Sequence, residues 1–231
     1  MKYQLHLETQ FEENPYSGLY VALEGIDGSG KTAQVKKIAA YYENLGKEVI
    51  LVREPRKEAG LMKAITNDIL QGNIEVPRSA YQYLFTADRI MQFHEVIVPA
   101  LKSGKVVISD RAFWSAIPYG MWERGGESTN EAQVILLSQG LIAMQHGCLV
   151  PDITFYLQVD VATALKRIPQ KIGEREEIYE KKEILEKVLK GYDWLIKEFP
   201  DQLQTIDATQ SIDQVTAAIL KKLGKHEKAI Q

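Results

Sequence analysis

The sequence has 231 residues, of which 45% are hydrophobic and 26% are charged, and its formal net charge is −3. These values suit one globular α/β domain with a sizeable core, and the small negative charge excludes a global field that would attract nucleic acid. The single cysteine, Cys148, excludes an internal disulfide and a cysteine metal cage, and it fits a reducing compartment.

Residues 1–17 carry three glutamates and no apolar core, which is typical of neither a signal peptide nor a membrane anchor. No later segment contains eighteen uninterrupted apolar residues, so we expect no membrane span and a cytoplasmic protein. We predict an N-terminal extension over 1–17, one domain over 18–225 and a tail over 226–231.

Five short apolar runs alternate with helical patterns, which predicts a parallel sheet with helices on both faces. The runs cover residues 19–23, 49–52, 106–108, 153–157 and 203–206. The predicted fold class is therefore an α/β three-layer sandwich with a five-stranded parallel sheet. Ligands should gather at the carboxyl ends of its strands.

The first run leads into Gly25–Thr32, which reads G-x-x-x-x-G-K-T and is a P-loop pattern. Its glycines let backbone N–H groups approach phosphate oxygens, and the helix that starts at Lys31 adds partial positive charge. Lys31 can reach the β- and γ-phosphates, and the Thr32 hydroxyl can bind Mg²⁺. The predicted ATP-binding residues of the loop are Gly25, Ile26, Asp27, Gly28, Ser29, Gly30, Lys31 and Thr32. The structural alternative is a glycine-rich turn with a surface lysine.

Helical spacing of apolar residues continues from the loop through Leu45, and Gly46 supplies a stop. Further helices are predicted over about 58–70, from 77 to about 101 with Pro99 bending the last turn, from 130 onward, and over about 179–199. A last helix should begin at Ser211, where Gln214 can complete a capping box.

Two arginines and an aspartate follow predicted strands. Asp110 can hold Mg²⁺ or its waters, and Arg111 beside it can clamp a second phosphate. Arg53 follows the second strand, so two guanidiniums should converge on one edge of the sheet. The competing interpretation is that Asp110 and Arg111 form a solvated surface ion pair.

Phe85 and Arg89 are four residues apart, so they share one face of a helix. A ring that stacks on a base and a guanidinium that hydrogen-bonds to it would form a base-reading pair. A core phenylalanine with a surface arginine fits the spacing equally well.

Together, these motifs resemble those of the thymidylate kinase family, in the family's usual order. The resemblance covers about residues 19–223 and rests on residues 24–32, 53–55, 85–89, 110–111, 151–154, 164–167 and 205–209. It implies a five-stranded parallel sheet with a short lid, ATP and Mg²⁺ as donor and cofactor, transfer of the γ-phosphoryl group to dTMP, and a homodimer.

The resemblance also implies roles for individual residues. Asp27 would accept from the sugar 3′-hydroxyl of dTMP, Arg53 and Arg111 would bind its phosphate, and Arg167 would lie against the adenine of ATP. Around the acceptor, Phe85 would stack on thymine, Arg89 would hydrogen-bond to it, and Ser115 and Tyr119 would line the pocket. The implied catalytic residues are Lys31, Asp110, Arg111 and Arg175, and the implied metal ligands are Thr32 and Asp110.

The sequence departs from the family pattern in four motifs. Arg56 and Lys57 replace glycines and should add positive charge near the acceptor. Ala112 replaces an aromatic or imidazole ring of the acceptor pocket, and Gly120 replaces a polar side chain there. In the predicted lid, residues 169–178, Glu176 and Glu177 replace a D-R pair and leave Arg175 or Lys171 as the basic residue. Two alternatives therefore stay open: a related kinase with another acceptor, and a nucleotide-binding regulatory protein with little activity.

Overall fold

The computed structural model describes residues 11–56, 63, 73, 76–125, 138–145, 147–168 and 181–230, without the side chains of 78, 79, 122–125 and 227–230. The helix predicted over 58–70 lies almost entirely outside these residues, as does the start of the helix predicted from 130. The predicted lid over 169–178, with Lys171 and Arg175, also lies outside them.

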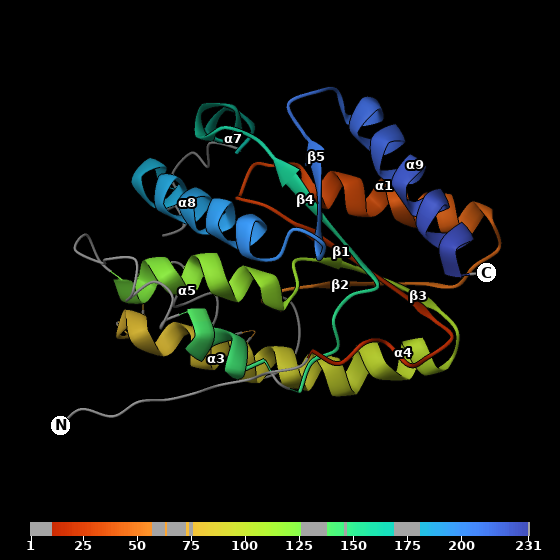
Figure 1. Ribbon diagram of the computed structural model, residues 1–231, viewed down its shortest axis with the longest axis horizontal. Helices are drawn as coiled ribbons and strands as arrows, with labels where there is room; N and C mark the ends of the chain where they lie inside the picture. The colour runs from red at the N-terminus through yellow and green to blue at the C-terminus, as the bar shows by residue number, and fades with distance from the viewer. Residues whose placement is uncertain are drawn as a thin grey trace.

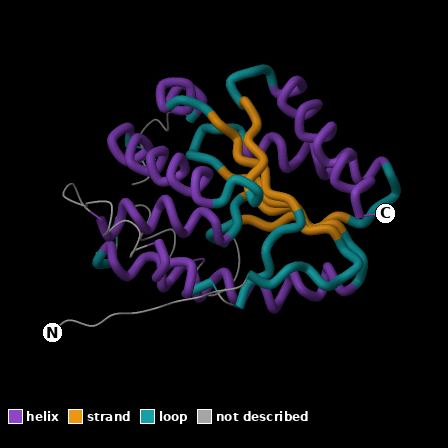
Figure 2. The backbone as a smooth tube through the Cα atoms, viewed as in Figure 1, coloured by secondary structure: helices purple, strands orange, loops and turns teal. Residues whose placement is uncertain are grey.

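One sheet of five parallel strands forms the centre of the molecule (Figure 2). The strands are β1 (Leu19–Glu24), β2 (Val49–Arg53), β3 (Val106–Asp110), β4 (Ile153–Gln158) and β5 (Leu203–Asp207), in the order β2-β3-β1-β4-β5. All five predicted strands are confirmed, and each continues slightly further at its carboxyl end. The register places Leu23 and Arg53 on either side of Asp110. The ends of β1, β2 and β3 therefore meet at one edge, where the P-loop begins.

Helices cover both faces of this sheet, which confirms the predicted three-layer fold (Figure 1). On one face α1 (Lys31–Asn44) packs beside α9 (Ile212–Ile230), and on the other lie α3 (Arg78–Gln92), α4 (Val98–Lys102), α5 (Ala116–Gly125) and α8 (Lys182–Glu198). A short helix, α7 (Val161–Arg167), follows β4. Successive residues of β3 serve opposite faces: Val106 and Ile108 belong to the larger core with α1, and Val107 packs with Leu101 of α4.

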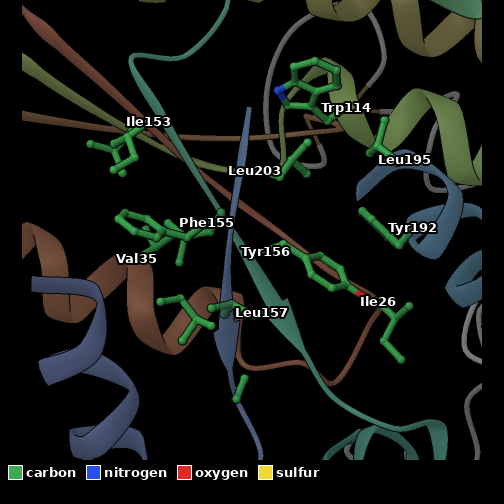
Figure 3. Close-up of a cluster of buried hydrophobic side chains, with 14 of the residues drawn as sticks. Ile26, Val35, Trp114, Ile153, Phe155, Tyr156, Leu157, Tyr192, Leu195 and Leu203 are labelled. Atoms are coloured by element: carbon green, nitrogen blue, oxygen red, sulfur yellow. The ribbon is translucent and has the colours of Figure 1, made fainter. Parts of the chain in front are cut away.

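The larger core gathers side chains from the strands, the P-loop and α8. Figure 3 shows ten of its labelled members, all buried: Ile26, Val35, Trp114, Ile153, Phe155, Tyr156, Leu157, Tyr192, Leu195 and Leu203. Tyr156 of β4 and Tyr192 of α8 have ring centroids 5.0 Å apart. This contact fixes α8 against the sheet close to the P-loop.

Three details differ from the predictions. The long helix is interrupted by a π-helical turn, Phe93–Ile97, because Pro99 has no N–H to continue the α-helical ladder. Leu45, predicted on the core face of α1, is 57% exposed. Leu51, which belongs to a continuous apolar run, is 50% exposed on the edge strand β2.

Both ends of the described chain pack on the domain. Phe11 contacts the rings of Phe113, Trp114 and Phe199, and the side chain of Asn14 donates to Asp152 at 2.8 Å. Helix α9 continues to Ile230, past residue 226 where a tail was predicted. The predicted capping box is present, since the backbone N–H and the hydroxyl of Ser211 both donate to Gln214.

Among the described residues, no helix combines the length and the apolar character needed to cross a membrane.

Candidate active site

The P-loop wraps around the start of α1 and uses three glycines with positive φ. Gly25, Gly28 and Gly30 have φ of 142°, 79° and 98°, which side chains other than glycine rarely adopt. A Cβ on Gly28 would also overlap the backbone of Ala164 in α7. The loop thus holds backbone N–H groups next to the N-terminus of α1, an arrangement that binds phosphate.

Lys31 is the cation of this loop. Its ammonium donates to the carbonyl oxygens of Gly25 and Ile26, both at 2.9 Å, and the side chain is buried. Burial, followed by the charge of Arg111, lowers the pKa of Lys31 to about 8. The lysine is therefore still mainly protonated at neutral pH and can attract a triphosphate. A surface lysine on a simple turn, the structural alternative, is excluded.

Thr32 and Asp110 form the oxygen pair that suits Mg²⁺. The Thr32 hydroxyl donates to Asp110 Oδ2 at 2.6 Å, although the residues come from α1 and the end of β3. Hydroxyl and carboxylate oxygens are ligands that Mg²⁺ takes together with phosphate oxygens and waters. The residues present therefore fit the ion that the sequence predicts here.

Arg111 lies between the P-loop and α5. It has a left-handed backbone, φ 78°, and its guanidinium donates to Gly25 O at 2.9 Å, Asp27 Oδ1 at 2.6 Å and the Tyr119 hydroxyl at 2.8 Å. Burial alone would lower its pKa, but the oxygens of Tyr119 and Asp27 hold the pKa well above the ordinary value. Arg111 is thus a buried permanent cation. Asp110 and Arg111 are both buried, so the predicted alternative of a solvated surface ion pair is wrong.

The acceptor side is built from the end of β2 and from α3. Arg53 is exposed and lies next to Asp110 in the register. Arg89 is buried and donates to Glu54 Oε2 at 2.6 Å and to Gln145 Oε1 at 2.8 Å. Arg89 is therefore not the surface arginine of the competing interpretation. Phe85 is half-buried beside the Tyr81 ring, at a centroid distance of 6.2 Å.

The departures from the family pattern are accommodated by packing. Arg56 was expected to add positive charge near the acceptor, but its guanidinium pairs with Asp88 and Glu95, each at 2.8 Å, which offsets that charge. A Cβ on Gly120 would lie 2.6 Å from Leu141 Cδ1. Position 120 therefore has no room for the polar side chain that the family pattern places there. Ala112 is fully buried.

Three further predicted residues take clear positions. The Ser115 hydroxyl is buried and 3.2 Å from Arg111, and Tyr119 lies with its ring 4.9 Å from the Arg111 guanidinium. Arg167 of α7 donates to the carbonyl of Ala208 at 2.8 Å, and so joins α7 to the segment after β5 where adenine was predicted.

The predictions missed three polar residues that hold the predicted ones in place. Glu54 and Gln145 bind Arg89, and Glu24, the last residue of β1, is fully buried. One signal was available for Glu24: a carboxylate ending an apolar strand, directly before a phosphate loop, must find hydrogen-bond donors.

A P-loop after the central strand and a carboxylate from the neighbouring strand define a P-loop nucleotide-binding protein. Comparison with known proteins narrows this class. The family model of thymidylate kinase matches residues 23–219, so the chain belongs to the thymidylate kinase family.

Individual relatives agree over nearly the whole length. The chain is 36% identical to "Probable thymidylate kinase" of Pyrococcus horikoshii, over 91% of this chain and 97% of that protein. It is 33% identical to "Thymidylate kinase" of Chlorobium luteolum, over 91% and 99%. The crystal structure of thymidylate kinase from Ehrlichia chaffeensis superposes with a TM-score of 0.64 at 25% identity, covering 89% of this chain and 98% of that one.

Proposed function

We propose that the protein transfers the γ-phosphoryl group of ATP to dTMP and releases dTDP and ADP. The observation that carries this proposal is the placement of two anion sites at one edge of the sheet. The P-loop with Lys31 would form one. Arg111, which donates to the P-loop carbonyl of Gly25, and Arg53, next to Asp110 in the register at the end of β2, would form the other. Membership of the thymidylate kinase family supplies the identity of the two nucleotides.

In the proposed reaction an oxygen of the dTMP phosphate attacks the γ-phosphorus, and the bond between that phosphorus and the β,γ-bridging oxygen breaks. The attacking oxygen is already ionised at neutral pH, so no strong general base is needed. The two anions repel each other, and Lys31, Arg111 and the loop N–H groups offset that repulsion. Mg²⁺, held by Thr32 and Asp110, would neutralise charge on the transferring phosphate.

The remaining assignments belong to the same proposal. Phe85, Arg89, Ser115 and Tyr119 would surround the acceptor nucleoside, Asp27 would accept from its 3′-hydroxyl, and Arg167 would lie near adenine. Arg175 is proposed as the cation that the lid brings to the transferring group. A homodimer is inferred from the family, and a cytoplasmic location from the lone, buried, free Cys148.

The acceptor is tested by measuring ATP-dependent phosphorylation of dTMP, dUMP, UMP, dCMP, dGMP and dAMP with Mg²⁺ present. We expect the highest kcat/KM for dTMP. A comparable or higher value for another monophosphate would refute the choice of acceptor and favour the related kinase. Binding of ATP without turnover of any of the six would favour a regulatory protein.

The donor site is tested by two lysines on the same helix. Lys31→Ala should reduce turnover by at least about 10²-fold, as loss of one transition-state donor does elsewhere. Lys36→Ala, at an exposed position of α1, is the matched control and should leave turnover unchanged. Equal activity of the two variants would contradict the assignment of the P-loop.

A further inference from the structure

Glu24 is a buried carboxylate held by neutral donors. Its Oε1 accepts from the backbone N–H groups of Ala112 at 2.9 Å and Ser115 at 3.1 Å. Its Oε2 accepts from the Ser115 hydroxyl at 2.5 Å and from the Tyr192 hydroxyl at 2.7 Å. The residue is 0% exposed, so solvent does not share in satisfying this charge.

Each hydroxyl makes its shortest contact with Glu24 Oε2, closer than the 3.1 Å between the two hydroxyl oxygens or the 3.5 Å from the Tyr192 hydroxyl to Gly25 O. Each hydroxyl has one proton to donate and lone pairs with which to accept. If both protons point at Glu24, the oxygens of Ser115 and Tyr192 can only accept on their other side. The group that lies there is Arg111 Nη1, 3.2 Å from Ser115 Oγ and 3.4 Å from the Tyr192 oxygen. Glu24 thus turns two hydroxyl dipoles so that their negative ends face the guanidinium.

The other nitrogen of the same guanidinium faces the ligand side. Nη2 of Arg111 donates to Asp27, whose side chain is 34% exposed, and to Tyr119. Nη1 is therefore the anchored end of the guanidinium, and Nη2 is the end available to a phosphate that displaces Asp27. The left-handed backbone of Arg111, whose N–H donates to Leu23 O at 2.9 Å, fixes where the side chain starts.

Tyr192 reaches this cluster because two helices pack unusually closely. The residue before it, Gly191, faces Pro118 of α5, and a Cβ on Gly191 would lie 2.6 Å from Pro118 Cα. The glycine lets α8 come close enough to α5 for the Tyr192 hydroxyl to meet Ser115 and Glu24.

We propose that Glu24 and Tyr192 are positioning residues for Arg111, acting with Ser115 to hold its guanidinium in the orientation that binds the acceptor phosphate. Neither residue needs to touch a substrate. The inference rests on the proposed function, because it assigns the anchored cation to the acceptor phosphate in that reaction.

The test is Tyr192→Phe, which removes one hydroxyl and keeps the ring. We expect kcat/KM for dTMP to fall about 10-fold, as expected for loss of one hydrogen bond in a charged network, while KM for ATP changes by less than about 2-fold. The matched control is Tyr156→Phe. Tyr156 is 1% exposed and lies against Tyr192, but in the part of the chain that the structure describes its hydroxyl makes no hydrogen bond to Glu24, Ser115 or Arg111. The control should keep wild-type kinetics.

Repeating the change in an Arg111→Lys background separates positioning from general packing. If Tyr192 acts through the guanidinium, Tyr192→Phe should cost less than about 2-fold in that background. An equal loss in both backgrounds, or wild-type kinetics for Tyr192→Phe itself, would overturn the proposal.

A readout that does not need catalysis distinguishes this failure from failure of the proposed function. In ¹⁵N NMR spectra of the full chain, the two Arg111 Nη resonances should be separate in wild type and in Tyr156→Phe, because the anchored guanidinium rotates slowly. They should exchange faster in Tyr192→Phe, where Nη1 keeps its contacts with Gly25 O and Ser115 and loses the one with Tyr192. An exchange rate equal to that of wild type in Tyr192→Phe would overturn the positioning role, whereas a wild-type protein that is inert toward dTMP would overturn only the function.

Discussion

Replacing Glu54 by alanine should destabilise the fold strongly, because the change leaves Arg89 buried without its charged partner. Glu54 Oε2 and Arg89 Nε are 2.6 Å apart, and both side chains are only 6% exposed. Removing one member of such a pair typically costs about 3–5 kcal/mol, since the remaining charge is neither solvated nor neutralised. For a chain of this size that corresponds to a fall in Tm of about 6–20 °C.

A surface pair with the same separation provides the matched control. Glu48 Oε2 and Lys105 Nζ are also 2.6 Å apart, but their side chains are 74% and 32% exposed. Glu48→Ala should therefore leave stability within experimental error, because solvent replaces the lost partner. Urea unfolding followed by circular dichroism measures both variants on the same scale.

The double replacement Glu54→Leu with Arg89→Met makes the reasoning refutable. Burial raises the pKa of Glu54 despite the attraction of Arg89, which shows that ionising this carboxyl inside the fold is costly. Removing both charges should therefore destabilise the protein less than Glu54→Ala alone, although it should abolish any reading of the base by Arg89. If Glu54→Ala were no worse than Glu48→Ala, or the double variant were the least stable, the account of this pair would be wrong.

Three further outcomes are expected. Gly120→Ala should lower the free energy of unfolding in urea by about 1–3 kcal/mol, because its Cβ would clash with Leu141. Gly224→Ala in α9 is the control and should be neutral or stabilising, because the space around that position is open. Equal effects of the two changes would contradict this explanation. Burial raises the pKa of Cys148 to about 11, so iodoacetamide at pH 8 should label the native thiol far more slowly than the urea-unfolded one, as mass spectrometry would show. Because the pKa of Lys31 is lowered to about 8, the lysine loses its charge as the pH rises through 8. We therefore expect kcat/KM for ATP to fall above about pH 8. A value of kcat/KM that stays constant up to about pH 9.5 would contradict this expectation.

The sheet was predictable because each of its strands is a short, nearly continuous apolar run. Such runs are typical of parallel strands that are buried on both faces. Positions at the edge of a layer were less predictable. Leu51 belongs to an apolar run as continuous as the others, yet β2 is an edge strand and leaves that side chain half exposed. Strand order depends on long-range pairing, which the apolar pattern of one strand does not encode.

In the candidate site, the residues that belong to a sequence motif for ligand binding were predicted. The residues that only hold those side chains in place were missed. The P-loop pattern led to Lys31 and Thr32 because phosphate and Mg²⁺ chemistry fixes their spacing. Tyr192 lies in the helix predicted over about 179–199, and its buried ring packs in the larger core. Its hydroxyl pairs with Glu24, 168 positions away, and no local spacing could indicate that contact.

The position of β1 in the middle of the sheet has a consequence for synthesis of the chain. β1 is the first strand to be made, but its partners are β3 and β4, the last of which ends at Gln158. At about 5–20 residues per second, the ribosome needs roughly 10–30 s to deliver them. Until β3 (Val106–Asp110) has been made β1 lacks partners on both edges, and until β4 has been made it lacks a partner on one. Fragments that stop before β4 would keep one edge of β1 open to pairing with other chains.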